Sequence, residues 1–187
     1  MFYLLLDYLA PHNDNTYSND AAGLIAMHCT EHSGVGGESF IIDGFQICDK
    51  LKREYPDVYQ RLCETIITCE FIDKDKHHSF SAPIISIDPL TGLPNQIRYH
   101  IYDRAPFDTL PMNQMRQYYS DWKILANEVN NPANQFQFKL YPGTVIIIDN
   151  WRLIHGRQAY TGLRTIAGCY VSRSEFQSAL RMNKTIE

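Results

Sequence analysis

Two histidines and one aspartate have the types and spacing that could bind a metal ion. His12 and Asp14 are two residues apart in the string PHNDNTY, and residues i and i+2 of an extended segment share one face, so their side chains can converge. His155 follows a predicted strand in the string DNWRLIHGR. Two imidazoles and one carboxylate on one face of an ion form the facial triad that binds Fe(II) in non-haem oxygenases. The alternative for Asp14 is a turn or capping role.

An arginine and a serine could bind a second molecule beside such an ion. Arg164 lies nine residues after His155, in TGLRTIAGCY, and opens the next predicted strand. An arginine can hold one end of a dicarboxylate such as 2-oxoglutarate by two parallel hydrogen bonds while the other end chelates the metal. Ser39 follows Gly36 and Gly37 and could donate its hydroxyl to the same molecule. The alternatives are a surface ion pair for Arg164 and a simple turn into a strand for Ser39.

The elements that must position these residues are mostly strands. Hydrophobic periodicity predicts strands around residues 23–29, 39–42, 65–72, 84–87, 96–102, 135–140, 144–149 and 165–171. Two helical intervals interrupt them, residues 46–64, broken at Pro56, and residues 112–130, which we expect to brace a sheet. The turn strings DPLTGLPNQ and YPG each predict a hairpin. The pattern predicts a mainly β chain with inserted helices, a sandwich or jelly roll.

Composition bounds the class of protein. The chain has 187 residues, and this length predicts one domain over residues 1–187. With 17 lysines and arginines against 21 aspartates and glutamates, its net charge is −4, and we expect no binding of nucleic acid or of an anionic membrane surface. No apolar run approaches the roughly 20 residues that span a bilayer. Five cysteines without a CxxC pair argue against a disulfide framework. We therefore expect a reducing intracellular compartment.

Several strings together resemble a known family. PHNDNTY, HCTEHSGVGGESFIIDGF, IRYHIYDRAP, LYPGTVIIIDNWRLIHGR and TGLRTIAGCYVSR are similar, in this order, to the Fe(II)- and 2-oxoglutarate-dependent dioxygenases of carnitine biosynthesis. The resemblance runs from about His12 to about Arg173. It implies a double-stranded β-helix, a cofactor set of Fe(II), 2-oxoglutarate and ascorbate, and the hydroxylation of a small trimethylammonium compound.

The resemblance also implies roles for individual residues. His12, Asp14 and His155 match the catalytic iron ligands, Arg164 matches the arginine that binds the distal carboxylate of 2-oxoglutarate, and Ser39 falls at a hydroxyl position of the cosubstrate pocket. Tyr170 falls where the family has an aromatic of the trimethylammonium cage. A quaternary ammonium has no N–H to donate, so aromatic rings are its main means of recognition. The alternative for Tyr170 is an ordinary core residue.

Two adjacent charges bear on the choice of substrate. Both trimethyllysine and gamma-butyrobetaine carry a trimethylammonium group and a carboxylate. Trimethyllysine has in addition an α-ammonium beside its carboxylate. Asp103 and Arg104, in RYHIYDRAP, suit an α-ammonium and an α-carboxylate respectively. We therefore expect hydroxylation of trimethyllysine to 3-hydroxytrimethyllysine, with gamma-butyrobetaine hydroxylation to carnitine as the alternative. The other interpretation is that Asp103 and Arg104 only pair with each other.

Family members are longer at the N-terminus, and this difference leaves the activity of the chain open. The sequence starts with an apolar, strand-like run and shows neither a signal nor a transit peptide. We expect the C-terminal part of a longer architecture, with a jelly roll incomplete at its N-terminus, and the rival hypothesis is a catalytically idle fragment. Tyr3 or Tyr8 could supply a further cage wall. The resemblance implies the mitochondrial matrix, with the cytoplasm as the alternative, and we allow for a homodimer.

Overall fold

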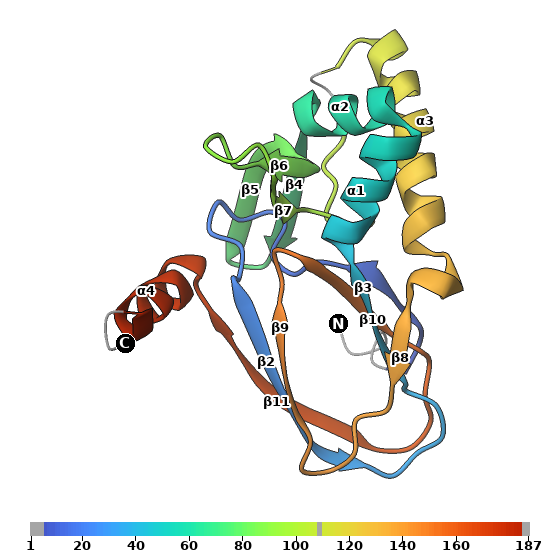
Figure 1. Ribbon diagram of the computed structural model, residues 1–187. Helices are drawn as coiled ribbons and strands as arrows, with labels where there is room; N and C mark the ends of the chain where they lie inside the picture. The colour runs from blue at the N-terminus through green and yellow to red at the C-terminus, as the bar shows by residue number, and fades with distance from the viewer. Residues whose placement is uncertain (1–5, 108–109, 185–187) are drawn as a thin grey trace.

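Two facing sheets make up one half of the molecule (Figure 1). The computed structural model describes residues 6–107 and 110–184. The first sheet has the order β1 (Leu9–His12), β10 (Leu153–Arg157), β3 (Ser39–Asp43), β8 (Phe136–Phe138). The second has the order β11 (Arg164–Val171), β2 (Leu24–His32), β9 (Val145–Asp149). All neighbours in both sheets are antiparallel, and the expectation of a mainly β jelly-roll-like chain with inserted helices is confirmed.

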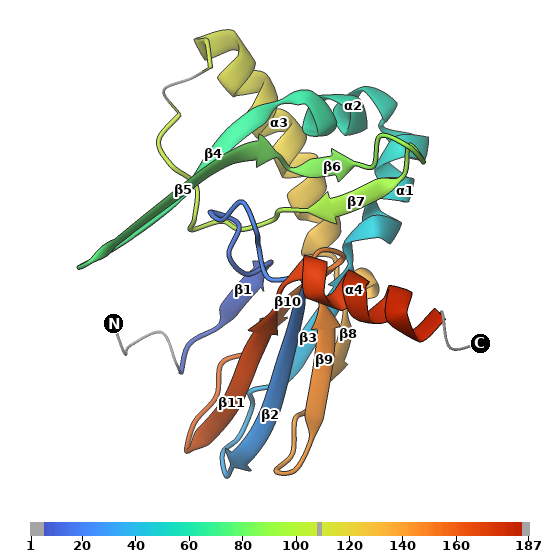
Figure 2. The same ribbon diagram turned by 90° about the vertical axis from the view of Figure 1, so that its left-hand side faces the viewer.

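The other half holds the inserted helices and two short hairpins (Figure 2). The helices are α1 (Gly44–Glu54), α2 (Pro56–Glu64) and α3 (Met112–Val129), and the hairpins pair β4 (Ile66–Asp73) with β5 (Lys76–Pro83) and β6 (Ile85–Ile87) with β7 (Pro94–Ile97). A short 3-10 helix (Pro132–Asn134) leads into β8, and α4 (Arg173–Lys184) follows β11 at the side of the molecule. This arrangement places the helices at one end of the paired sheets.

Local sequence explains where α1 and α2 begin. The Asp43 side chain accepts hydrogen bonds from the backbone N–H groups of Phe45 and Gln46 at 3.0 and 3.2 Å, so it caps the N-terminus of α1. Pro56 stands in the first turn of α2, where its missing N–H costs nothing. The predicted break at Pro56 is confirmed.

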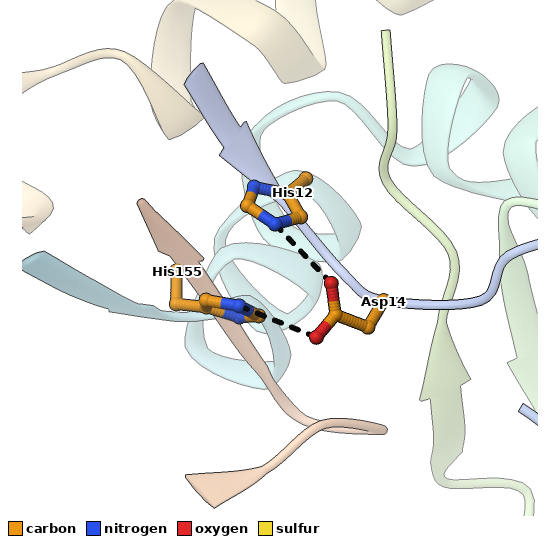
Figure 3. Close-up of side chains that lie close together, drawn as sticks. All are labelled: His12, Asp14 and His155. Atoms are coloured by element: carbon orange, nitrogen blue, oxygen red, sulfur yellow. Dashed lines mark ion pairs between the residues drawn. The ribbon is translucent and has the colours of Figure 1, made fainter. Parts of the chain in front are cut away.

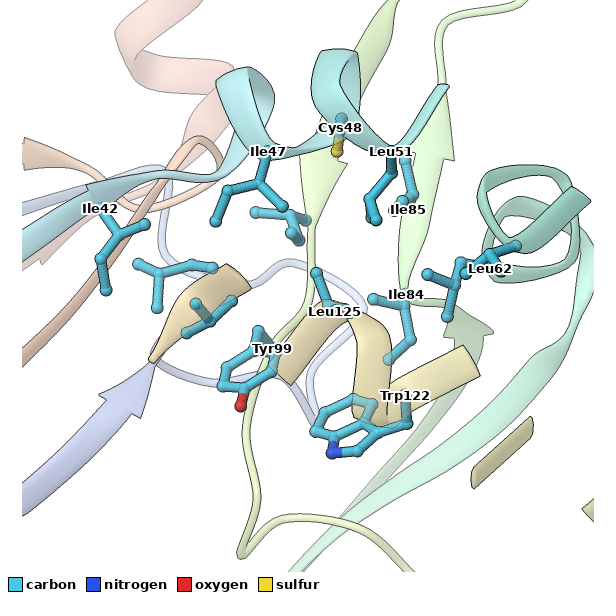
Figure 4. Close-up of a cluster of buried hydrophobic side chains, with 14 of the residues drawn as sticks. Ile42, Ile47, Cys48, Leu51, Leu62, Ile84, Ile85, Tyr99, Trp122 and Leu125 are labelled. Atoms are coloured by element: carbon cyan, nitrogen blue, oxygen red, sulfur yellow. The ribbon is translucent and has the colours of Figure 1, made fainter. Parts of the chain in front are cut away.

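A buried cluster ties the helices to the sheets (Figure 4). Its members come from α1, α2, α3, β3, β4, β6, β7 and β10, and include Ile42, Leu51, Leu62, Ile85, Leu125 and Ile154. The rings of Tyr99 and Trp122 stack in parallel, with centroids 4.8 Å apart. The prediction that α3 braces a sheet is wrong in detail, because α3 packs mainly on α1 and α2 and is joined to α2 by the Arg61–Asp121 ion pair at 2.7 Å.

Other sequence expectations need correction. The predicted strand at residues 96–102 ends at Ile97, because the backbone N–H and C=O of Tyr99 bond instead to Asn13. The DPLTGLPNQ hairpin is confirmed as the β6–β7 turn. The YPG turn makes no hairpin, since β8 pairs with β3 and β9 pairs with β2, so it crosses from one sheet to the other. The sequence analysis missed β1, β5, β10 and α4.

Two further features concern chemistry and location. All five cysteines are free thiols. Among the described residues, no helix has the length and apolar character needed to cross a bilayer.

Candidate metal centre and cosubstrate pocket

Two neighbouring strands bring the two histidines together. His12 is the last residue of β1 and lies opposite His155 of β10 in the antiparallel register. Directly opposed residues of an antiparallel pair project on the same face of a sheet, and the two imidazole rings have centroids 4.5 Å apart. The His12 Nδ1 atom lies 2.8 Å from the carbonyl oxygen of Ala10, a contact that orients the ring. Residues 143 positions apart therefore meet through strand pairing.

Asp14 lies just beyond the end of β1 and turns back toward both rings (Figure 3). Its Oδ1 atom is 3.3 Å from His12 Nε2, and its Oδ2 atom is 3.8 Å from His155 Nε2. Asn15 follows with φ +57°, a left-handed conformation that asparagine tolerates better than most residues. The segment is therefore a turn rather than the extended strand that the sequence pattern suggested, yet it converges on the same point.

The environment favours the protonation states that bind metal. Burial, with a smaller contribution from the neighbouring His12, lowers the pKa of His155 to about 3, so this imidazole is neutral at pH 7. Burial alone would raise the pKa of Asp14, but the hydrogen bond with His12 and the charges of His155 and His12 outweigh it and lower that pKa to about 2. A neutral imidazole and an ionised carboxylate are the forms in which these side chains ligate a metal.

The donor set fits a metal ion. One ligand atom from each of His12, Asp14 and His155 lies within 4.8 Å of the other two. Ligands about 2.1 Å from an ion and at right angles to one another are about 3 Å apart, so small rotations of these side chains would satisfy one ion. Two imidazoles and one carboxylate suit Fe(II) and leave further coordination positions open.

A pocket of about 210 Å³ opens beside these three residues, between the two sheets. Its walls are largely apolar side chains from both sheets, among them Leu9, Met27, Phe40, Phe138, Ile146 and Ile148. Polar groups line it at two places: the His12, Asp14 and His155 cluster, and a group formed by Ser39, Arg157 and Arg164. An apolar cleft with a few convergent polar groups is the usual form of a small-molecule site.

The predicted cosubstrate residues line this pocket. Arg164 opens β11, and its guanidinium lies over the ring of Tyr160, 5.8 Å from the centroid. Its buried Nε atom has no hydrogen-bond partner among the described residues. Burial lowers the pKa of Arg164, an effect that Tyr160 and Cys29 oppose. Ser39 is 8% exposed and lines the same pocket. The geometry therefore places a cation and a hydroxyl where a carboxylate could be held.

Arg157 is a pocket residue that the sequence analysis missed. It is two residues after His155, is 6% exposed, and its guanidinium lies 4.6 Å from the centroid of the Tyr160 ring. Its Nη1 atom donates to the carbonyl oxygen of Gln158 at 2.7 Å. The alternating burial of a strand could have shown that residues 155 and 157 share a face, had β10 been recognised.

Tyr170 reaches the metal centre through its hydroxyl. The hydroxyl donates to Asp14 Oδ2 at 3.1 Å, and the ring borders a second pocket that Asp14 and Met27 also line. Burial and the Asp14 charge both raise the pKa of Tyr170, so the hydroxyl keeps its proton. Arg164 and Tyr170 are six residues apart in β11, an even spacing that puts both side chains on one face of the strand. Tyr8 stacks on Phe40 at 6.0 Å, and Tyr3 lies outside the described residues.

Asp103 and Arg104 do not pair with each other; they have separate partners. Asp103 accepts a hydrogen bond from Thr16 Oγ1 at 2.8 Å and lies beside His100, whose ring packs edge-on against His12 with centroids 5.2 Å apart. Burial raises the pKa of Asp103. The Arg104 guanidinium instead lies over the α3 ring of Trp122 at 5.0 Å. Of the two, only Asp103 lies near the metal centre.

Comparison with known families adds a match over most of the chain. Residues 5–170 match the family described as taurine catabolism dioxygenase TauD, TfdA family. The chain is 34% identical over 175 residues to the trimethyllysine dioxygenase, mitochondrial, of Gallus gallus, covering 91% of this chain and 42% of that protein. It is 31% identical over 186 residues to the gamma-butyrobetaine dioxygenase of Homo sapiens, covering 93% of this chain and 46% of that protein. The chain thus spans less than half the length of these relatives.

A solved structure has the same fold. A putative alpha-ketoglutarate-dependent taurine dioxygenase from Burkholderia xenovorans superposes with a TM-score of 0.69 at 15% identity, over 87% of this chain and 58% of that one. At this identity, the likeness concerns the fold alone.

Proposed function

This chain belongs to the taurine catabolism dioxygenase TauD, TfdA family, and from that premise we propose that it is an Fe(II)- and 2-oxoglutarate-dependent dioxygenase that hydroxylates trimethyllysine. The observation that supports the chemistry best is the convergence of His12, Asp14 and His155, with ligand atoms within 4.8 Å of one another beside an apolar pocket. The substrate is proposed from the relatives, among which trimethyllysine dioxygenases share 30–34% identity and a gamma-butyrobetaine dioxygenase shares 31%.

The three metal-binding side chains would act as the ligands of Fe(II). When bound, iron with 2-oxoglutarate and O2 supplies the oxidising chemistry that inserts one oxygen atom into a C–H bond, while 2-oxoglutarate becomes succinate and CO2. The chain keeps the His155 imidazole neutral and the Asp14 carboxylate ionised, and it holds one ligand atom from each of the three side chains within 4.8 Å of the other two. The same three side chains line the pocket that Ser39 and Arg164 also line.

Arg164 and Ser39 would hold 2-oxoglutarate. The guanidinium forms a planar fork of donors that matches a carboxylate, and the apolar walls from both sheets exclude water around it. An ion pair in such surroundings is stronger than one in bulk water. These residues would fix the far carboxylate of the cosubstrate, so that its keto acid end points to the His12, Asp14 and His155 cluster.

Tyr170 and Asp103 would contact the substrate. The Tyr170 ring offers an aromatic face for a trimethylammonium group. Asp103 contacts His100, whose ring packs against His12, and its carboxylate would pair with an α-ammonium. Arg104 remains a prediction from the sequence, since its guanidinium packs on α3. The cage would aim one C–H bond of the substrate at the metal centre.

Other properties are carried over from the relatives as part of this proposal. Ascorbate would keep the iron reduced, and the proteins named above as mitochondrial suggest the mitochondrial matrix. Residues 1–187 would form one catalytic domain, the C-terminal part of a longer family architecture, with a homodimer as the assembly to test. The alternative candidate is a catalytically idle chain that turns over neither compound.

One experiment tests this proposal. The purified chain is incubated with Fe(II), 2-oxoglutarate, ascorbate and O2, with trimethyllysine in one sample and gamma-butyrobetaine in another, and succinate and hydroxylated products are measured by mass spectrometry. We expect succinate and 3-hydroxytrimethyllysine, both absent with the His155→Ala variant. Hydroxylation of gamma-butyrobetaine alone would show that this compound, and not trimethyllysine, is the substrate. A folded, iron-loaded chain that forms no succinate would favour the catalytically idle alternative.

A further inference from the structure

Two buried asparagines hold the turn that carries Asp14. Asn13 is 2% exposed and Asn150 is 1% exposed. Both are uncharged, and both lie outside the lining of the pocket described above and outside the metal-binding cluster. A buried amide that lacks partners is costly, so such residues persist only where their hydrogen bonds are made. Asn13 stands between His12, the last residue of β1, and Asp14, and Asn150 stands in the turn between β9 and β10.

Asn150 bonds to both backbone groups of Asp14. Its Oδ1 atom accepts from the Asp14 N–H at 2.9 Å, and its Nδ2 atom donates to the Asp14 carbonyl oxygen at 3.1 Å. The second Nδ2 hydrogen goes to the carbonyl oxygen of Ala22 at 2.9 Å. The orientation of the amide follows from these partners, because an N–H can only donate and a carbonyl can only accept. The side chain therefore holds both peptide groups that flank the Asp14 Cα atom.

Asn13 makes hydrogen bonds to the segments on the other side of the turn. Its Nδ2 atom donates to the carbonyl oxygens of Asn150 and Leu153 at 2.8 and 3.1 Å, and its Oδ1 atom accepts from the Tyr99 N–H at 3.0 Å. Its own N–H donates to the Tyr99 carbonyl oxygen at 2.7 Å. Leu153 is two residues before His155, so Asn13 joins the turn carrying Asp14 to the strand carrying His155.

Together the two amides donate three of their four hydrogens to the two segments that carry the proposed ligands, and the fourth goes to the carbonyl oxygen of Ala22. We propose that Asn13 and Asn150 form a clamp of positioning residues that fixes the carboxylate of Asp14 relative to His12 and His155, and so sets the metal affinity of the site. This inference rests on the proposed function, because it concerns the same three ligands. Neither asparagine touches the metal, the cosubstrate or the substrate; both act through the backbone around Asp14.

The geometry favours a positioning role over general packing. Strand pairing alone aligns His12 with His155, but Asp14 lies past the end of β1, where no ladder bond reaches it. The bonds from Asn150 to the Asp14 N–H and carbonyl replace that missing ladder. Partners that orient a metal ligand typically change metal affinity by about 10- to 100-fold when they are removed.

The test measures metal binding and folding separately. Co(II) is titrated by calorimetry into the wild-type chain and into Asn13→Ser, Asn150→Ser, the double variant and a control, Asp121→Asn. Asp121 is also 2% exposed and fully bonded, to Arg61 and Gln117, but it lies on α3 and joins helices only. Circular dichroism and urea unfolding report the fold of each variant. Asn150→Asp, which keeps the side-chain volume and the Oδ1 acceptor, serves where a serine variant does not fold.

The clamp predicts at least about a tenfold loss of Co(II) affinity in each folded asparagine variant, and wild-type affinity in Asp121→Asn even where urea shows that it is less stable. The double variant should lose about as much as the worse single variant, because both side chains hold one turn. Wild-type affinity in the folded asparagine variants, or a fully additive loss in the double variant, would overturn the clamp. A wild-type chain that binds no Co(II) would instead overturn the proposed function.

Discussion

An exposed tyrosine donates a hydrogen bond to the Oδ2 atom of the Asp14 carboxylate. Tyr170 is 58% exposed, yet its hydroxyl donates to Asp14 Oδ2. A hydrogen bond that occupies this oxygen would leave Oδ1 to face the metal. The same ring is proposed to contact the trimethylammonium group, so two functions of one side chain can be separated by substitution.

We predict that Tyr170→Phe weakens Co(II) binding about fivefold, since a single hydrogen bond contributes about 1 kcal/mol, and leaves KM for trimethyllysine near the wild-type value. Tyr170→Leu should also raise that KM, because the aromatic face is lost, an effect worth about 0.5–2 kcal/mol. Calorimetry and steady-state kinetics measure the two effects. An unchanged KM in Tyr170→Leu would remove Tyr170 from the cage.

Arg164 offers a second prediction at this scale. Arg164→Lys keeps the positive charge but loses the planar fork, so KM for 2-oxoglutarate should rise about tenfold or more, by the energy of a charge-assisted hydrogen bond. KM for trimethyllysine should change little. Arg53→Lys, on the exposed face of α1 with a side chain 69% exposed, is the matched control. Equal KM values for 2-oxoglutarate in Arg164→Lys and wild type would contradict the assignment.

Sequence reasoning reached some residues of the site and not others, for physical reasons. His12 and Asp14 could be recognised because a two-residue spacing needs only local geometry. Arg157 was missed because β10 was not recognised as a strand. Asn13 and Asn150 could not be recognised, since their roles come from contacts between segments about 140 residues apart in the chain. An asparagine between two ligands looks like a turn residue until its partners are known.

At the scale of elements, short strands escaped the hydrophobic pattern. Strands β1 and β10, of four and five residues, hold the two histidines, but four residues with a proline give little periodicity. Longer elements such as α3 and β11 were found, because several turns or alternations accumulate signal. The elements most important to the site were thus the hardest to predict.

One capping interaction joins α1 to the turn before β10. The Asp43 carboxylate caps α1 and also pairs with Arg152, at 2.6 Å. Burial would raise the pKa of Asp43, but the hydrogen bonds from Arg152 and from the backbone of Gln46 and Phe45 lower it overall. Because the folded-state pKa lies below the unfolded one, the stabilisation is present above the unfolded pKa, near 3.9, and is lost as the pH falls through the folded pKa.

We therefore predict that Asp43→Ala lowers the free energy of unfolding at pH 7 by about 0.5–2 kcal/mol, and that the difference from wild type shrinks as the pH is lowered from 5 toward 3. Urea unfolding at several pH values measures it. The control is Asp88→Ala, another carboxylate bonded to backbone N–H groups, in the β6–β7 turn. A difference for Asp43→Ala that grows toward low pH would contradict the account of the cap.

For the whole molecule, metal binding should be coupled to folding. The proposed ligands come from β1, the following turn and β10, which lie at opposite ends of the chain. An ion bound only by the folded state stabilises it by about 2.7 kcal/mol at a free concentration 100 times Kd. For a domain of this size, that corresponds to a rise in Tm of roughly 5–11 °C.

We predict this rise for the wild-type chain in Co(II) and its absence in His155→Ala, measured by circular dichroism or calorimetry. His28→Ala is the control, since His28 lies exposed in β2, in the other sheet. It should respond to Co(II) as the wild type does. A Tm that rises equally in His155→Ala would place the ion elsewhere.

The most direct measurement of the central claim is the visible spectrum of the chain under anaerobic conditions with Fe(II) and 2-oxoglutarate. A site that holds Fe(II) by His12, Asp14 and His155, with 2-oxoglutarate bound to Arg164, should show the weak charge-transfer band of the iron chelate. The band should be absent in His155→Ala and should need more 2-oxoglutarate in Arg164→Lys. A folded wild-type chain without the band, or the same band in His155→Ala, would contradict the account.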